Sequence, residues 1–564
     1  MFKQILLVFT TFFSTIYASK ETVYTDFYIA LRQSNVEILK STLLDISNPK
    51  SAKYGKFLNI DYVNNLVSPP QEEKKLIYNW LEKNDLKILN DYGDCIQSYG
   101  SLKSIDNIFK VNMIEYEKNK YWSEIPYKIP DKFKNIIIFV EGISNKHSSQ
   151  KRIKPRSSYI MSKNVDNRYV AQEAFYWLYN ISKENINVST SMASIEYGGG
   201  NGFNINDFQA AQKLNNVSVT NVTHVIDCSA GSDVESQLDM QMMAINGGNN
   251  TDIWYWGNDN WLYSLAVDMF NNETIPHVIS MSYGWAEDNQ CSITQCNNET
   301  SAQYVERVNV EYVKLGLRGV TITVSSGDAG APGRTSEGCD ASRPLNSAFP
   351  GSSPWITSVG ATFVVDNGKS RDWNSSLCVE NGCIGSKKQR VTNFADTGWT
   401  SGGGVAKLSS RLSIQDQAVR DYMNSDVSLP HGINENGRMY PDVTAVGHYC
   451  PVIDGGGLNA VDGTSCSSPL FATIVTLLNQ HQIANGKPKL GFINPVLYMM
   501  YYENVNAFGD ITEGNISCTE QACCDMNKRN GSDFGYSATI GYDPVYGLGT
   551  PNVGVMMEWL DRNT

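Results

Sequence analysis

The sequence predicts an α/β protein: a doubly wound parallel sheet over residues 166–564, preceded by a smaller α/β domain. Three observations support this class. From about residue 165, β-branched runs end in small polar loops and lead into helical patterns. Residues 20–147 instead mix amphipathic helices with a buried strand. A hydrophobic fraction of 41% and a charged fraction of 18% exclude an intrinsically disordered chain.

Charge and length exclude further classes. The 564 residues include 46 Lys and Arg against 58 Asp and Glu, and the net charge of −12 argues against nucleic acid as a partner. The length is that of two or more domains. The one hydrophobic stretch able to enter a membrane lies at the N-terminus, which excludes a multi-span transporter.

The N-terminus has the three-part pattern of a secretory signal peptide. Lys3 precedes an apolar run from Ile5 to Ile16, and the small residues Ala18 and Ser19 follow. The run is shorter than the roughly 20 residues of a spanning helix, so a membrane anchor is the weaker alternative. We expect residues 1–18 to be removed, leaving no membrane span in the mature chain.

Residues 20–147 are predicted to form a domain that ends in a basic linker. Val36–Ile46 and Glu72–Leu86 have the periodicity of amphipathic helices, and Ile136–Val140 has the composition of a buried strand. The polar stretch that follows contains Lys151, Arg152, Lys154 and Arg156. Exposed basic linkers are preferred sites of proteolysis, so we expect processing here, although an ordinary surface loop has the same composition.

The later part of the chain repeats a strand, a polar loop and a helix. The three strand-and-loop pairs are Val222–Ile226 with Ser229-Ala230-Gly231, Val278–Met281 with Ser282-Tyr283-Gly284, and Val320–Val324 with Ser326-Gly327-Asp328. In a doubly wound sheet, ligands bind beyond the carboxyl ends of the strands. These loops are therefore predicted to line a binding cleft.

Ser465 is a candidate nucleophile. It lies in the string Asp462-Gly-Thr-Ser-Cys-Ser-Ser-Pro469, directly before an apolar helical run from Leu470 to Leu478. Backbone N–H groups at a helix N-terminus could stabilise an oxyanion formed by attack on a carbonyl. A serine that merely caps the helix is the alternative.

A nucleophilic serine needs a base, and histidine is the usual one. None of the six histidines stands in a glycine-rich string typical of a protease triad; they are His147, His224, His277, His431, His448 and His481. A Ser-His-Asp triad is therefore not expected.

Glu235 and Asp239 offer another base. They are four residues apart on a predicted helix and share one face, and the methionines that follow suggest that the helix is buried. Two crowded, buried carboxylates cannot both ionise easily, so one pKa rises and that group can act as a base at acidic pH. A solvated acidic face is the alternative.

Asp328 is a third candidate because it directly follows a predicted strand. It could stabilise a turn. In its protonated form it could instead donate a hydrogen bond to an oxyanion in the same cleft.

Together these strings resemble the sedolisin family of serine-carboxyl peptidases, and within it the tripeptidyl peptidases of animal lysosomes. Gly463, Thr464, Ser465, Ser467 and Pro469 match the family's nucleophile motif, with Asp462 in place of a serine and Cys466 at a variable position. The resemblance implies that Ser465 is the nucleophile and Glu235 its general base. It further implies that Asp239 orients Glu235 and that Asp328 is the oxyanion donor.

The resemblance extends over nearly the whole chain. Its further segments are Leu31–Glu37 and Asn48–Leu58 before the linker, and Ile275–Gly284, Phe349–Thr362, Ser401–Gly404 and Tyr440–Val443 after it. It implies a subtilisin-like catalytic domain over residues 166–564 and a ferredoxin-like inhibitory propeptide over residues 19–165. It also implies a substrate cleft that includes Ser282, Tyr283, Gly284, Ser401, Gly402 and Gly403.

The same comparison implies one structural calcium site near the C-terminus. Asp510, Ile511, Thr539, Gly541 and Asp543 match the family's ligand segments, with Thr539 in place of a frequent glycine. Oxygen-only ligands in tight loops suit Ca²⁺. Without the family context, both aspartates would be taken as turn residues.

Cysteines and glycosylation sequons agree with a secretory route. Cys291 with Cys296 and Cys378 with Cys383 are predicted local disulfides, while Cys518, Cys523 and Cys524 form a cluster for which Cys339 is a candidate partner. Zinc is disfavoured at this cluster because no histidine is adjacent. The ten sequons are Asn180, Asn187, Asn216, Asn221, Asn249, Asn272, Asn298, Asn374, Asn515 and Asn530.

We therefore expect an acid-active peptidase made as a proenzyme, with its own propeptide as intramolecular inhibitor and polypeptides as substrates. Release of tripeptides from free N-termini is the leading specificity, and endopeptidase activity is the alternative. A non-catalytic calcium-binding glycoprotein is a third and less favoured interpretation. The expected compartment is the secretory pathway, ending in the lysosome, another acidic compartment or export.

Overall fold

The structure is a computed structural model. It describes residues 20–117, 119–144, 159–160, 171–182, 188–197, 202–228, 231–258, 260–294, 296, 300–336, 345–366, 369–371, 378–379, 382–383, 387–503, 505–524 and 535–564. The predicted signal peptide, the basic linker and Cys339 lie outside these residues, as do Ser229, Ala230, Asn187, Asn298, Asn374 and Asn530. No helix in the described part of the chain is long and apolar enough to cross a membrane.

The chain divides into two compact units, of which the first comprises residues 1–32 and 69–144. Its antiparallel sheet has the order β2-β3-β1-β6. The elements of this unit are β1 Tyr24–Leu31, α3 Gln71–Glu82, β2 Lys87–Asp91, β3 Cys95–Ser101, α4 Leu102–Phe109, β4 Ile114–Glu117, β5 Lys120–Trp122 and β6 Ile137–Glu141. Sheet and helices enclose a core that includes Phe27, Trp80 and Phe109. The smaller α/β domain is confirmed.

One predicted helix ends earlier than its hydrophobic pattern suggests. The pattern predicted Glu72–Leu86, but α3 stops at Glu82. Asp85 adopts a left-handed backbone conformation with φ 58°, which turns the chain back. Leu86 is buried in the same core after the turn rather than on the helix.

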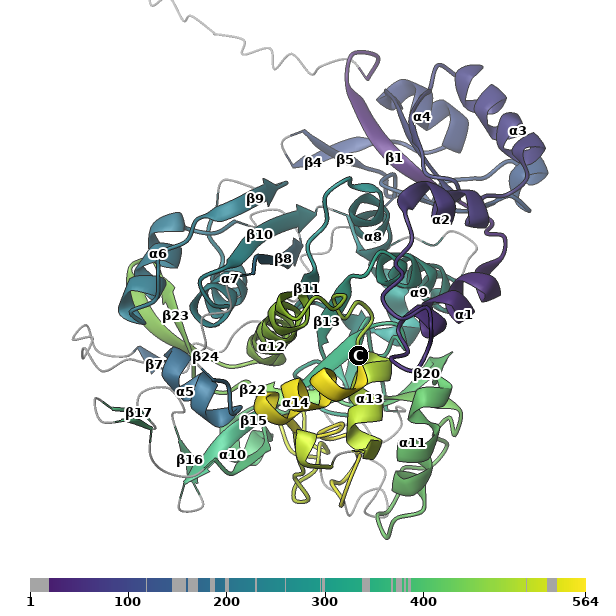
Figure 1. Cartoon of the computed structure of the whole chain (residues 1–564). Coiled ribbons are helices and arrows are strands. Elements are labelled where there is room, and N and C mark those ends of the chain that lie inside the picture. Colours follow the sequence, from purple (N-terminus) through teal and green to yellow (C-terminus); the bar gives the residue numbers. More distant parts are fainter. Residues whose placement is uncertain are drawn as a thin grey trace, which may run out of the picture. The chain divides into compact units, whose positions relative to one another are not determined.

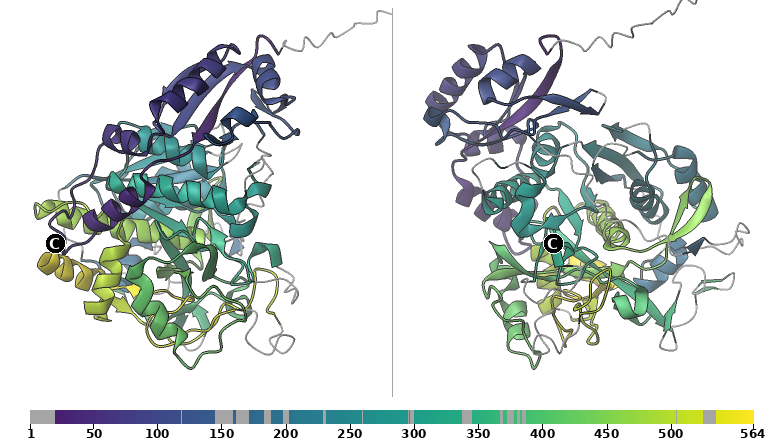
Figure 2. Two further views of the ribbon diagram at one scale, coloured as in Figure 1. Left: turned by 90° about the vertical axis from the view of Figure 1, so that its right-hand side faces the viewer. Right: turned by 180° about the vertical axis from the view of Figure 1, so that it is seen from behind.

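Residues 33–68 group with the second unit, which also contains residues 145–564. Helix α1, Val36–Ile46, has the predicted bounds and packs against helix α9, Ser301–Leu317 (Figures 1 and 2). The segment continues through helix α2, Ile60–Val67. Between the two helices, the Leu58 N–H donates to the Leu317 carbonyl over 2.8 Å.

The second unit is built on a nine-stranded sheet with the order β16-β15-β13-β11-β8-β10-β9, to which β19 and β22 pair at β15 (Figure 1). Strands β8 to β15 run parallel along this path. The strands are β8 Thr190–Tyr197, β9 Val222–Ile226, β10 Thr251–Asn258, β11 Val278–Met281, β13 Thr321–Ser325, β15 Thr357–Asp366, β16 Lys369–Arg371, β19 Gln389–Val391 and β22 Val443–Val446. The predicted parallel sheet is confirmed, with β9 and β11 at the predicted bounds.

Helices cover both faces of this sheet. Helices α6 Ile205–Leu214 and α7 Val234–Asn246 contact each other, and α7 also contacts α12, Thr464–Ala484. Helices α8 Leu262–Asn271 and α9 contact each other; α9 and α12 both contact β13 and lie on opposite faces. The connections β9–α7–β10, β10–α8–β11 and β11–α9–β13 all move along the sheet in the same direction. If all three crossovers were right-handed, α7, α8 and α9 would lie on the same face of the sheet. Because α7 packs with α12 instead, the β9–α7–β10 connection is an exception to this rule, and it sets α7 and α12 side by side.

The remaining elements close the second unit. They are β7 Tyr159–Ile160, α5 Ala171–Leu178, β12 Trp285–Ala286, β14 Ala348–Phe349, β17 Cys378–Val379, β18 Gly382–Cys383, α10 Phe394–Thr397, β20 Gly404–Ser410, α11 Asp416–Met423, β21 Gly437–Tyr440, β23 Cys450–Asp454, β24 Gly457–Val461, α13 Asn494–Glu503, β25 Phe508–Gly509, β26 Thr550–Pro551 and α14 Val553–Asn563.

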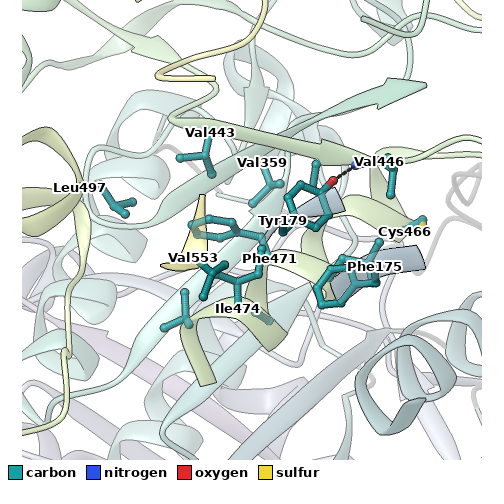
Figure 3. Close-up of a cluster of buried hydrophobic side chains, with 14 of the residues drawn as sticks. Phe175, Tyr179, Val359, Val443, Val446, Cys466, Phe471, Ile474, Leu497 and Val553 are labelled. Carbon is teal, nitrogen blue, oxygen red and sulfur yellow. Dashed lines mark hydrogen bonds between the residues drawn. The ribbon is translucent and has the colours of Figure 1, made fainter. Parts of the chain in front are cut away.

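Helix α12 lies at the centre of the core. Phe471 and Ile474 of this helix pack with Phe175 and Val359 from other elements (Figure 3). The Val446 N–H donates to the Tyr179 hydroxyl over 2.7 Å inside the same cluster (Figure 3). Because apolar contacts surround α12, the start of the helix is held rigidly.

Candidate active site

The beginning of α12 is fixed by the hairpin that precedes it. Strands β23 and β24 lead through Asp462 into the turn, where the Gly463 N–H donates to the Gly447 carbonyl over 2.9 Å. A disulfide joins Cys466 to Cys450 at the start of the hairpin. The residue directly after Ser465 is therefore covalently tied to β23. Sequence reasoning missed this disulfide, although the two cysteines flank a strand-turn-strand pattern.

Helix α7 presents the predicted acidic pair. Asp233 caps the helix by accepting the Glu235 N–H over 3.0 Å. Glu235 and Asp239 lie one turn apart, and both side chains are almost fully buried. The alternative of a solvated acidic face is therefore wrong: the face packs into the interior beside α12.

Crowding and burial change the protonation of the acidic pair. Burial, and after it the Asp239 carboxylate, raise the pKa of Glu235 well above its usual range. Burial and the Glu196 carboxylate likewise raise the pKa of Asp239. Ser282 donates to Asp239 Oδ2 over 2.6 Å and partly opposes that rise. The cluster therefore retains protons at pH values where exposed carboxyls are ionised.

Glu196 is a member of this cluster that sequence reasoning missed. It lies near the carboxyl end of β8 and accepts hydrogen bonds from Ser194 over 2.6 Å and from Tyr283 over 2.8 Å. Burial raises the pKa of Glu196 to about 7. The signal available in the sequence was a single charged residue in a strand pattern with no other charge, since a buried carboxyl needs a partner or a function.

Ser465 faces Glu235. The Ser465 hydroxyl is near enough to lower the pKa of Glu235, against the effect of burial. Neither Ser465 Oγ nor either Glu235 oxygen makes a hydrogen bond of good geometry within the described part of the chain. The Ser465 hydroxyl and the Glu235 carboxyl therefore lie near each other without forming a hydrogen bond, as is common in catalytic sites that hold no substrate.

Asp328 holds the turn that carries Ser465. Its Oδ1 accepts both the backbone N–H and the hydroxyl of Thr464, each over 2.8 Å. A Cβ added at Gly463 would lie 3.6 Å from Asp328 Oδ2 and 3.6 Å from Ser465 Cβ. The absent side chain leaves space between the serine and the carboxyl. Burial raises the pKa of Asp328, while Arg334 and the Thr464 bonds oppose the rise.

Histidine does not serve Ser465. Its hydroxyl has no hydrogen-bond partner among the described residues, which include every histidine except His147. His448 lies in the loop before β23, where its Nδ1 is 2.9 Å from Asp462 Oδ1. Asp462 also accepts the Tyr449 N–H over 2.8 Å. The aspartate that occupies the motif's serine position thus ties this loop to the turn that carries Ser465.

The predicted cleft residues take different positions. Gly284 and Gly402 line a pocket beside Asp328. Ser282 and Tyr283 instead direct their hydroxyls to Asp239 and Glu196. Ser401 is buried and accepts the Ala361 N–H over 2.9 Å. A Cβ added at Gly403, the sixth residue of this set, would lie 2.2 Å from the Pro544 carbonyl.

Two acidic residues meet near the C-terminus. Asp510 Oδ2 accepts the Gly541 N–H over 2.9 Å, and Asp543 Oδ2 accepts the Thr539 N–H over 2.9 Å. Burial raises the pKa of Asp543 to about 8, and Asp510 adds to the rise. No group of three or more His, Cys, Asp or Glu able to hold a metal occurs in the described part of the chain. A cation here would need main-chain oxygens, which Ile511, Thr539 and Gly541 could supply.

Other predicted features have these outcomes. The Cys291–Cys296 disulfide is confirmed, and Cys518 bonds to Cys523. Cys378 of β17 pairs in register with Cys383 of β18. The disulfide between them stays a prediction. Among the described sequons, Asn180, Asn216, Asn221 and Asn249 are exposed, and Asn272 and Asn515 are half-buried. Glycosylation also stays a prediction.

Comparisons with known proteins agree with this geometry. A family model described as the activation domain of pro-kumamolisin matches residues 16–146. Physarolisin of Physarum polycephalum is 35% identical over 93% of this chain and 91% of its own length. Tripeptidyl-peptidase 1 of Homo sapiens is 28% identical over 94% of this chain and 90% of its own length.

A solved structure shares the fold. Pseudomonas sedolisin, a serine-carboxyl proteinase complexed with pseudo-iodotyrostatin, matches with a TM-score of 0.51 and 20% identity, covering 70% of this chain and 99% of that one. The subtilisin-like catalytic fold and the preceding activation domain are thereby confirmed. This chain belongs to the sedolisin family of serine-carboxyl peptidases.

Proposed function

We propose that Ser465, Glu235, Asp239 and Asp328 form the catalytic machinery of an acid-active peptidase made as a proenzyme. The observation that carries this proposal is the convergence of α7, α12 and the end of β13. It brings a buried serine between an acidic pair and a third carboxyl that holds the catalytic turn through Thr464.

The roles follow from which atoms can exchange protons. Glu235 takes the proton from Ser465 Oγ as the oxygen attacks the scissile carbonyl carbon. Protonated Asp328 donates a hydrogen bond to the resulting oxyanion in the space that Gly463 leaves open. Glu235 then gives its proton to the leaving amine, and water releases the acyl group by the same path. Asp239, held by Ser282, orients Glu235.

The required protonation states favour acidic pH. Asp328 must be protonated to donate, while Glu235 must be able to accept a proton. The raised pKa of Asp328 keeps its donor form to higher pH than in an ordinary carboxyl. The raised pKa of Glu235 moves the lower edge of the window upward, because the base form appears only as Glu235 loses its proton. Activity is lost as Asp328 ionises at higher pH.

The propeptide would extend over residues 19–165 and inhibit the enzyme until it is cleaved in the basic linker. Its segment 33–68 supports this view by forming ion pairs with the rest of the second unit. Lys40 Nζ is 2.7 Å from Glu306, and Lys50 Nζ is 2.6 Å from Glu503. Acid protonates such carboxylates and removes the pairs, although each exposed pair contributes only about 0–1 kcal/mol.

Calcium would be held by Asp510 and Asp543 with the carbonyls of Ile511, Thr539 and Gly541. The two carboxylates fit a divalent cation because burial makes both costly to ionise, and the Asp510 carboxylate adds to that cost at Asp543. Bound Ca²⁺ would remove that repulsion and cross-link two loops. Its role here is structural.

Release of tripeptides from free N-termini is the leading specificity. Its support is the similarity to tripeptidyl-peptidase 1 over 94% of this chain. Endopeptidase activity is the second candidate, because the relative with 35% identity is not named for tripeptide release. An acidic compartment of the secretory pathway, such as the lysosome, matches the protonation states; export is the alternative.

The test compares a peptide with a free amino terminus and its acetylated counterpart at about pH 4. Tripeptide release from the free peptide alone would support the leading specificity, and internal cleavage of both would support the endopeptidase. The Ser465→Ala variant should cleave neither. Persistent cleavage by that variant would contradict the assigned nucleophile.

A further inference from the structure

The chain departs from the sedolisin motif beside the proposed nucleophile, where Asp462 stands in place of a serine. Asp462 is 5% exposed, so its carboxyl group lies out of water at the turn that carries Ser465. A buried carboxylate is costly unless it has a partner or a function. The proposed roles of Glu235 and Asp328 do not explain why an acid is present at this position.

A partner of Asp462 is His448, from the loop between β22 and β23. Its Nδ1 is 2.9 Å from Asp462 Oδ1, and the histidine is 3% exposed. Neither ring nitrogen makes a hydrogen bond of good geometry within the described part of the chain. The ring packs against Tyr449 at 3.9 Å between centroids and meets Phe363 edge-on at 6.2 Å. The contact with Asp462 is therefore mainly one of charge, because an imidazole beside a carboxylate is ordinarily protonated at acidic pH.

Asp462 also fixes the backbone of the same loop. Its Oδ1 accepts the Tyr449 N–H over 2.8 Å, and Tyr449 has a left-handed backbone conformation with φ 57°. A bulky residue keeps this conformation only where its surroundings enforce it. The Gly447 carbonyl accepts the Gly463 N–H over 2.9 Å, and a Cβ added at Gly447 would lie 2.7 Å from the Gly463 carbonyl oxygen. The loop and the turn before Ser465 are therefore held together closely.

The same turn is held by Asp328. Thr464 follows Gly463, and its N–H and hydroxyl both donate to Asp328 Oδ1 over 2.8 Å. Burial is the largest cause of the raised pKa of Asp328. Arg334 and the Thr464 bonds oppose the rise, and the Asp462 carboxylate adds to it. Asp462 therefore acts on Asp328 in two ways, through the position of the turn and through its charge.

We propose that His448 and Asp462 are a pair of positioning residues that sets the turn before Ser465 and favours the hydrogen-bond-donating form of Asp328. This inference rests on the proposed function of Asp328 as oxyanion donor and adds the groups that control its protonation. The two members of the pair act in opposite directions. The Asp462 carboxylate opposes ionisation of Asp328, and a protonated His448 balances part of that effect.

The first test compares pH profiles of kcat and KM for the activated enzyme and its Asp462→Asn variant on one preferred peptide. The amide still accepts the Tyr449 N–H but has no charge, so Asp328 should ionise at lower pH. We expect the high-pH limb of the kcat profile to move downward by about half a pH unit. Maximal kcat should fall by about tenfold with KM changed less than about twofold, because Asp462 acts on the turn rather than on the substrate.

The second test removes the cation. His448→Gln leaves the Asp462 charge unbalanced, so the high-pH limb should move upward, opposite to its movement in Asp462→Asn. His448→Phe should move the limb in the same direction and lower kcat by about tenfold, because it keeps the packing against Tyr449 but offers Asp462 no polar atom. Gln should recover part of that kcat by donating a hydrogen bond to Asp462. A purely structural role would lower kcat or thermal stability without moving the limb in opposite directions.

His481 and Asp561 provide a matched control pair. His481 lies near the other end of α12, and its Nε2 is 2.7 Å from Asp561 Oδ1. His481→Gln and Asp561→Asn remove the same kinds of charge at the end of the helix that is far from Ser465. Both variants should keep the wild-type kcat and the wild-type limb.

Either of two outcomes would overturn the inference: a limb that does not move downward in Asp462→Asn, or one that does not move upward in His448→Gln. Asp328→Asn separates this failure from failure of the proposed function. If the limb moves in Asp328→Asn but not in the variants of the pair, only the present inference fails. If it does not move in Asp328→Asn, the donor role of Asp328 is itself wrong. Asp462→Ser and His448→Phe decide in the same way if Asp462→Asn or His448→Gln does not fold.

Discussion

The second unit contains two pairs of carboxyl groups whose pKa values are raised by burial, but the groups that surround each pair differ. Glu235 and Asp239 lie on one buried helix beside hydroxyl donors such as Ser282. Asp510 and Asp543 come from separate loops whose backbone N–H groups point at them. Hydroxyls can exchange protons with a carboxyl, whereas fixed N–H groups can only stabilise its charge. The first surroundings therefore suit proton transfer, and the second suit a cation.

The largest test of this contrast is Glu235→Gln. The amide keeps the shape of the side chain but cannot accept the serine proton, so kcat should fall by roughly 10³-fold, measured on the preferred peptide. Thermal stability should not fall, because the substitution removes a buried carboxyl whose pKa is raised by burial and whose charged form is therefore costly. Asp252→Asn is the control because Asp252 is exposed on β10. Activity within tenfold of wild type would mean that Glu235 is not the base.

Replacing both Cys450 and Cys466 by Ala tests what holds the catalytic turn. The disulfide closes a loop across a sequence separation of 16, so its loss should lower the free energy of unfolding by about 3 kcal/mol. It should also lower kcat, because Ser465 precedes Cys466. The Cys291→Ala/Cys296→Ala control should lose stability without a loss of kcat. Equal kinetic effects of the two double variants would argue against a local role.

Chelation tests the second pair. At about 100-fold excess over its dissociation constant, a bound cation adds about 2.7 kcal/mol to stability, so EGTA should lower the melting temperature by several degrees. Asp543→Asn should start from a lower melting temperature and lose the response to EGTA. The Asp416→Asn control should keep it, since Asp416 pairs with Arg411 elsewhere. A wild-type protein indifferent to EGTA would refute the calcium site.

Asp328→Asn tests whether protonated Asp328 is the hydrogen-bond donor in the cleft, and it has the smallest expected effect. Because the folded pKa of Asp328 is raised, its donor form is lost as pH rises through that pKa. Asparagine donates at any pH, so the high-pH limb of the kcat profile should move upward, with maximal kcat reduced about tenfold. Asp328→Ala should lose roughly 10²–10³-fold. An unmoved limb in Asp328→Asn would assign the titration to another group.

Local patterns predicted much of the fold. Helix α1 and strands β9 and β11 have the predicted bounds, because hydrophobic periodicity and β-branched runs act over a few residues. Glu196 and the Cys450–Cys466 disulfide were missed, because their partners are distant in the sequence or their patterns were ambiguous. Nothing in the strand pattern of β8 indicates that Tyr283 will meet Glu196 from 87 residues away.

The sequence by itself determined the chemistry that this protein carries: a serine in a helix-starting turn, an acidic pair one helical turn apart and an aspartate at a strand end. Those features depend on neighbours along the chain. Only the tertiary structure decided that they meet, because the exceptional β9–α7–β10 connection sets α7 beside α12 and burial then raises the pKa values of their carboxyls. Burial and convergence are properties of the packed chain, and no local pattern contains them.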